Sequence, residues 1–97
     1  MFEIKFTSDA KIDLRYFTKA QQSGILDKVE QQLRHQPEVE TKNRKKLREN
    51  VISNYELRID TVRVFYNVYV AENVVDIVAV GWKEHNDLFI RGKKVNL

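Results

Sequence analysis

The sequence predicts an α+β fold in which an N-terminal strand and two helices are followed by a C-terminal β-meander. Two observations lead to this prediction. Apolar and polar residues alternate at the N-terminus and again over residues 55–70, which is the period of a strand with one buried face. Residues 8–36 instead carry apolar side chains at helical spacing. The helices should therefore pack on one face of a mainly antiparallel sheet and leave the other face partly open.

The first strand is predicted over residues 2–7, FEIKFT, where every second side chain is apolar. A short helix should follow, because Thr7 or Ser8 can cap it and Asp9 lies in its first turn. Its apolar side chains recur along one face at Ala10, Leu14 and Phe17.

A second helix is predicted from Thr18, which forms a T-x-x-Q capping box with Gln21. Pro37 should end it, and Gly24 inside it costs about 1 kcal/mol relative to alanine. The apolar stripe of this helix is Ile25, Leu26, Val29 and Leu33.

The segment 38-EVETKNRKKLREN-50 shows no regular period, so the sequence predicts a long irregular connection there. Connections in small domains usually run about 4 to 6 residues, and longer ones are more often functional or mobile than idle. This segment is either a solvated loop or a surface that contacts a phosphate backbone. Its basic residues are Lys42, Arg44, Lys45, Lys46 and Arg48.

Three consecutive antiparallel strands are predicted over residues 54–60, 62–71 and 74–83, joined by tight turns. The last is almost continuously apolar, as expected of a central strand or one covered on both faces. Residues 88–97 should add one more short strand or a docked extension.

Strand alternation determines which face each arginine takes in 57-LRIDTVRVFYNVYV-70. Val62 and Val64 suit the helix side, so Arg58 and Arg63 should point to the helix-free face. The aromatic residues Phe65 and Tyr69 are expected on that face too, and arginines beside aromatic rings resemble surfaces that bind phosphates and stack bases. The alternative is that both arginines are solvated and pair with acidic neighbours, namely Glu56, Asp60 or Asp76.

Lys83, His85 and Asn86 follow the last meander strand and form a further candidate site. Cleavage of RNA by its own 2′-OH needs a base, an acid and cations that stabilise the transition state. Arg58, Arg63 and Lys83 are candidates for the cations. His85 is the candidate for the proton transfers, because an unperturbed histidine has a pKa of about 6.5, near working pH. The alternative for His85 is a surface turn without a function.

Composition limits the class of protein. A chain of 97 residues suits one domain, which we expect to span residues 1–97. The net charge of +3 indicates a mild preference for anionic partners. The chain has no cysteine, so no disulfide or thiolate metal site is possible, and we expect no metal or cofactor. Without a signal sequence or a sufficiently long apolar window, the protein is expected in the cytoplasm and not in a membrane.

The segments 56-ELRIDTVRVFYNV-68 and 74-VVDIVAVGWKEHNDLFIRGKKV-95 resemble the RelE/ParE superfamily of type II toxins. The order of strand, two helices and meander is similar as well. The resemblance implies that Arg63 matches the strand arginine that RelE-like enzymes place on the scissile phosphate and that Lys83 matches the basic residue after the final strand. It also implies that His85 stands where some members carry a catalytic basic residue or histidine. The chain departs from the best-known members at three positions, because lysines are replaced at Asn54 and Glu56, and a tyrosine at Phe89.

The function that the resemblance implies is that of a toxin neutralised by a cognate antitoxin, with which it forms a hetero-oligomer. RelE-like members cleave mRNA in the ribosomal A site without a metal, which makes mRNA and the ribosome the expected partners. ParE-like members instead inhibit DNA gyrase. Three functions therefore remain open: a ribosome-dependent endoribonuclease that inhibits translation, a gyrase inhibitor, or an attenuated member that only binds its antitoxin.

Overall fold

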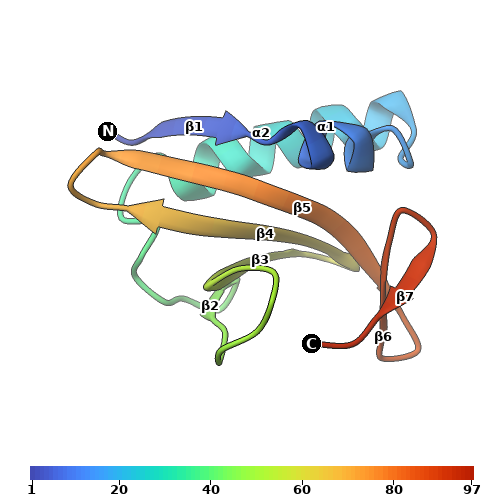
Figure 1. Ribbon diagram of the computed structural model, residues 1–97. Coiled ribbons are helices and arrows are strands. Elements are labelled where there is room, and N and C mark those ends of the chain that lie inside the picture. The colour runs from blue at the N-terminus through green and yellow to red at the C-terminus, as the bar shows by residue number, and fades with distance from the viewer.

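A computed structural model describes residues 1–97 and contains two helices and seven strands (Figure 1). The predicted α+β class and the order of strand, helices and meander are confirmed. In chain order the elements are β1 (Glu3–Phe6), α1 (Ser8–Leu14), α2 (Lys19–Leu33), β2 (Arg44–Lys46), β3 (Tyr55–Ile59), β4 (Val62–Tyr69), β5 (Val74–Glu84), β6 (Asp87–Ile90) and β7 (Lys93–Val95).

All seven strands belong to one sheet with the order β2-β3-β4-β5-β6-β7, and β1 pairs in parallel with β5. The other pairings are antiparallel. The strand β5 is bonded to β4 along most of its length, to β1 at its beginning and to β6 at its end (Figure 1). The prediction that this nearly continuous apolar strand is central is therefore confirmed.

Both helices begin at the predicted residues because threonines cap them. The Thr7 hydroxyl accepts a hydrogen bond from the Ala10 amide, and Thr18 forms the complete capping box with Gln21. These bonds satisfy amides that have no partner within a helix. Neither helix is long and apolar enough to cross a membrane.

The main core lies between the helices and the sheet. Leu33 and Val29 of α2 are almost fully buried there, as are Leu57, Val64 and Tyr66 of the meander. The Tyr66 hydroxyl donates to the Pro37 carbonyl oxygen at 2.9 Å, and burial raises the pKa of Tyr66. The helix-facing side predicted from alternation is therefore confirmed.

The prediction of an irregular connection over residues 38–50 is wrong in part, because Arg44–Lys46 form β2. The Arg44 guanidinium donates to the carbonyl oxygens of Gln32 and Val39, which ties the segment to the end of α2. The backbone is then placed to pair with β3, and the Arg58 amide donates to the Asn43 carbonyl oxygen at 2.8 Å.

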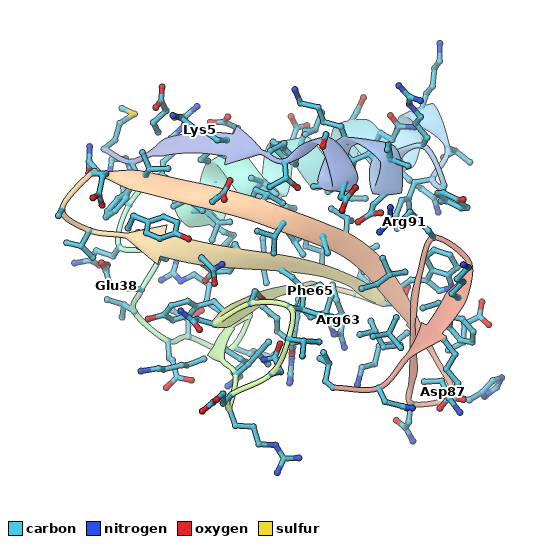
Figure 2. The ribbon with its side chains drawn as sticks, in the orientation of Figure 1. Lys5, Glu38, Arg63, Phe65, Asp87 and Arg91 are labelled. Atoms are coloured by element: carbon cyan, nitrogen blue, oxygen red, sulfur yellow. The ribbon has the colours of Figure 1, made fainter.

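The prediction that Phe65 lies on an open face is also wrong. Its side chain has no exposed surface and packs in a second, smaller core with Ala79, Leu88 and Ile90. The β6–β7 hairpin and residues 47–52 fold over this part of the helix-free face (Figure 2). The tail therefore forms two strands rather than one, and Figure 1 shows that they cross the end of β5.

Gly81 explains how the chain of β6 approaches β5 so closely. A Cβ atom at Gly81 would collide with the Phe89 carbonyl oxygen and would lie 2.8 Å from Cγ1 of Ile90. Only glycine leaves room for this approach, so Gly81 allows the C-terminal hairpin to cover the second core.

Candidate functional site

A cleft of about 380 Å³ opens beside the second core, between β3, residues 47–50, the β5–β6 hairpin and the end of the chain. Its wall combines both signs of charge with amide groups. The cations are Arg48, Arg58 and Lys83, the acids are Glu49, Glu56 and Asp87, and the amides are Asn50, Asn86 and Asn96.

Arg58 reaches this cleft as the partner of a buried carboxylate. Its Nε donates to Oε2 of Glu56 at 2.7 Å, and the Glu56 side chain is only 6% exposed whereas that of Arg58 is 46% exposed. A buried carboxylate needs a charged partner, and Arg58 supplies one. The predicted alternative, in which Arg58 pairs with Glu56, therefore describes part of its role, yet Arg58 still borders the cleft.

Lys83 and Arg48 are the cations of the cleft that form no ion pair within the chain. Lys83 is half-buried near the end of β5, where its amide donates to the Thr61 carbonyl oxygen at 2.8 Å. Arg48 is exposed and follows β2. Because no acidic side chain lies within ion-pair distance of either, these two cations are available to an anion.

Arg63 lies on the same face, directly across the β3–β4 pair from Arg58, but it does not line the cleft. Its Nη1 donates to the carbonyl oxygens of Asp60 at 2.6 Å and Val62 at 3.0 Å, and its Nε is buried without a partner. Burial lowers the pKa of Arg63 because it disfavours the charged guanidinium. Part of this side chain therefore supports the β3–β4 turn.

His85 and Asn86 form the two-residue turn between β5 and β6, with positive φ angles of 49° and 73°. Asn86 lines the cleft, whereas His85 is exposed and lies outside its wall. The surface turn considered for His85 from the sequence is therefore its location. His85 is the sequence neighbour of the cleft-lining Asn86, but its own side chain does not line the cleft.

The structure does not bring the basic residues of segment 42–48 together in one place. Arg44 is held by carbonyl oxygens, Lys42 and Lys46 are exposed away from the cleft wall, and only Arg48 lines the cleft. Lys45 stands opposite Glu56 in the β2–β3 register, so it shares the face of the arginines.

Sequence reasoning missed Glu56 as a member of this site. The signal was present, because alternation places Glu56 on the same side of β3 as Arg58. It also missed the position of Phe89, whose ring stacks on Trp82 with centroids 6.0 Å apart and an interplanar angle of 18°. Neighbouring residues in a strand point to opposite faces, so Phe89 points away from the face that Lys83 and Leu88 share.

The arrangement can hold an anion. Two unpaired cations and a partly exposed guanidinium converge on one cleft, and amide groups offer hydrogen bonds beside them. His, Cys, Asp and Glu side chains do not gather anywhere in groups of three that could hold a metal ion.

Comparison with known proteins identifies the fold. No protein-family model matches the chain, and no curated protein matches its sequence. Among solved structures, a chain of the toxin–antitoxin complex RelBE2 from Mycobacterium tuberculosis superimposes with a TM-score of 0.72. The two chains are 21% identical, and the match covers 84% of this chain and 98% of that one. The chain therefore has the RelE toxin fold, as the sequence resemblance implied.

Proposed function

We propose that the protein is the toxin of a type II toxin–antitoxin module and that it cleaves mRNA on the ribosome. One observation carries the proposal: on a RelE toxin fold, Arg48 and Lys83 remain unpaired and converge with Arg58 on one polar cleft. Unpaired cations that meet in a cleft are the feature that phosphate binding requires.

The chemistry follows from these groups. In-line attack of a ribose 2′-OH on the adjacent phosphate forms the 2′-O–P bond and breaks the P–O5′ bond, so one proton leaves the 2′-oxygen and one reaches the 5′-oxygen. We assign Lys83 and Arg58 to the phosphate, where they offset the charge that develops in the transition state. Arg63 supports Arg58 from the neighbouring strand, and His85 transfers protons from the turn that borders the cleft.

The proposal also includes the partners. The matched solved structure is a toxin–antitoxin complex, so we propose a cognate antitoxin for this protein and a cytoplasmic location, where mRNA and ribosomes occur. The unpaired cations of the cleft attract carboxylates as readily as phosphates, which favours an antitoxin with an acidic segment.

The proposal is tested by mapping RNA 5′ ends after induction of the wild-type protein, of Lys83→Ala and of Lys19→Ala. Lys19 is an exposed lysine at the start of α2 that does not line the cleft, and its replacement serves as the matched loss of one positive charge. Wild type and Lys19→Ala should cut mRNA within translated codons, and Lys83→Ala should not. Intact transcripts in arrested wild-type cells would contradict the proposal, and inhibition of gyrase supercoiling by the purified protein would replace it.

A further inference from the structure

A second groove, of about 320 Å³, lies on the other side of the β5 end from the cleft. Three aromatic side chains line it, and Lys83 lines both this groove and the cleft. The aromatic residues are Tyr16 and Phe17, which follow α1, and Trp82 of β5. Because Lys83 borders both spaces, an extended ligand whose phosphate contacts Lys83 in the cleft can place a neighbouring group in the groove.

We infer that this groove holds the base of a nucleotide that flanks the phosphate in the cleft, and that the base stacks on Tyr16. This inference rests on the proposed function. Aromatic rings beside a cationic track are the usual means of binding single-stranded nucleic acid, because every base has a π-face and the backbone has a charge at each phosphate.

The exposure of Tyr16 supports this role. The residue is 55% exposed, although the neighbouring Phe17 is buried and packs edge-on against Trp82 with centroids 5.7 Å apart. Trp82 is in turn covered on its face by Phe89. Trp82 therefore forms a rigid wall of the groove, and Tyr16 supplies the ring that is free to receive a ligand.

The polar groups of the groove suit a base rather than a second phosphate. Glu84 lines the groove, and its Oε1 accepts a hydrogen bond from Nε1 of Trp82 at 3.2 Å. Its other carboxylate oxygen has no partner in the chain and can accept a hydrogen bond from an exocyclic amino group. The same negative charge repels a phosphate, and Lys83 is the only cationic side chain that lines the groove.

The test uses ribosomes programmed with an mRNA in which a base next to the cleaved bond is either present or replaced by an abasic sugar, on each side in turn. Loss of a stacked base costs about 5- to 150-fold in binding. Tyr16→Ala should slow cleavage of the normal mRNA by a factor in this range, and Tyr16→Phe should restore the rate. One of the abasic mRNAs should slow the wild-type protein equally and should not slow Tyr16→Ala further.

Two outcomes overturn the inference. Additive losses from Tyr16→Ala and from every abasic mRNA would show that Tyr16 does not contact the base. A Tyr16→Ala variant that cleaves normally but binds its antitoxin less tightly would assign the groove to the protein partner.

A fluorescence measurement separates this inference from the proposed function, because Trp82 is the only tryptophan of the chain. A short 2′-O-methyl RNA, which cannot be cleaved, should quench Trp82, and the same oligomer with abasic sugars should not. If the normal oligomer quenches Trp82 but the protein cleaves no mRNA, the inferred base-binding groove stands and the proposed nuclease function is refuted. Cleavage by the wild-type protein together with an unquenched Trp82 and an unimpaired Tyr16→Ala would refute the base site and retain the nuclease.

Discussion

Removing either partner of the Glu56–Arg58 pair should have unequal effects on stability. The carboxylate is 6% exposed and the guanidinium is 46% exposed. Arg58→Met leaves a buried negative charge without its partner, whereas Glu56→Gln leaves an arginine that still reaches water. We therefore expect Arg58→Met to lower the free energy of unfolding by more than Glu56→Gln does.

The magnitude follows from the burial of the two groups. Breaking a fully buried ion pair costs about 3–5 kcal/mol, and a hydrogen bond to a charged group contributes about 1.5–3 kcal/mol. Because water screens the exposed half of Arg58, the expected loss for Arg58→Met is about 2 kcal/mol. Glu56→Gln keeps an oxygen that accepts from Nε of Arg58, so its loss should be about 1 kcal/mol or less.

Urea denaturation of the two single variants and of the double variant measures this difference. The double variant should be more stable than the sum of the single losses implies, because it removes the buried charge together with its partner. A larger loss for Glu56→Gln than for Arg58→Met would refute the reasoning, since the carboxylate would then not be the group that depends on its partner.

Three further predictions concern stability. Gly24→Ala should raise the free energy of unfolding by about 0.5–1 kcal/mol, seen as a higher Tm, because a Cβ at this exposed helical position meets nothing within 4 Å. Phe65→Ala should lower it by about 3–5 kcal/mol in urea denaturation, whereas Tyr69→Ala, which also faces away from the helices, should change it little. Burial raises the pKa of Asp13 above its ordinary value, even though the carboxylate accepts from the Val80 amide and pairs with Arg91. A raised pKa in the folded state means that the contribution of Asp13 to stability is present at low pH and is lost as pH rises through that pKa. Asp13→Asn should therefore remove this loss of stability, which begins as the pH rises above the ordinary aspartate pKa of about 3.9, and an unchanged profile of the free energy of unfolding against pH would contradict it.

The sequence was sufficient to predict the elements that local patterns determine. Thr7 and Thr18 start the helices through their own hydroxyl groups, and alternation in β4 separates Val64 from Arg63. These features depend on residues within a few positions of one another. The strand β2 was not predicted because its position depends on Arg44, which donates a hydrogen bond to the carbonyl oxygen of Gln32, 12 residues earlier in the chain.

The second core could not be predicted for the same reason. Alternation places Phe65 on the helix-free face, but it cannot show that a hairpin returns to cover that face. The return depends on Gly81, which has no side chain to prevent the approach of Phe89 and Ile90. The alternation of apolar and polar residues contains no information about this contact between strands. Phe65, which was expected to be exposed, is therefore buried.

The two unusual residues of the site are explained by the contacts they make. Glu56 stands where the resemblance implies a lysine. Its negative charge is neutralised by the ion pair with Arg58, whose guanidinium still lines the cleft. Phe89 stands where the resemblance implies a tyrosine, but its ring stacks on Trp82, on the opposite face of β6 from Leu88, which lines the cleft. A hydroxyl on that ring would therefore point away from a phosphate bound between Arg58 and Lys83. The proposed cleavage therefore takes the proton for the departing oxygen from another group, which we assign to His85, in the turn next to the cleft-lining Asn86.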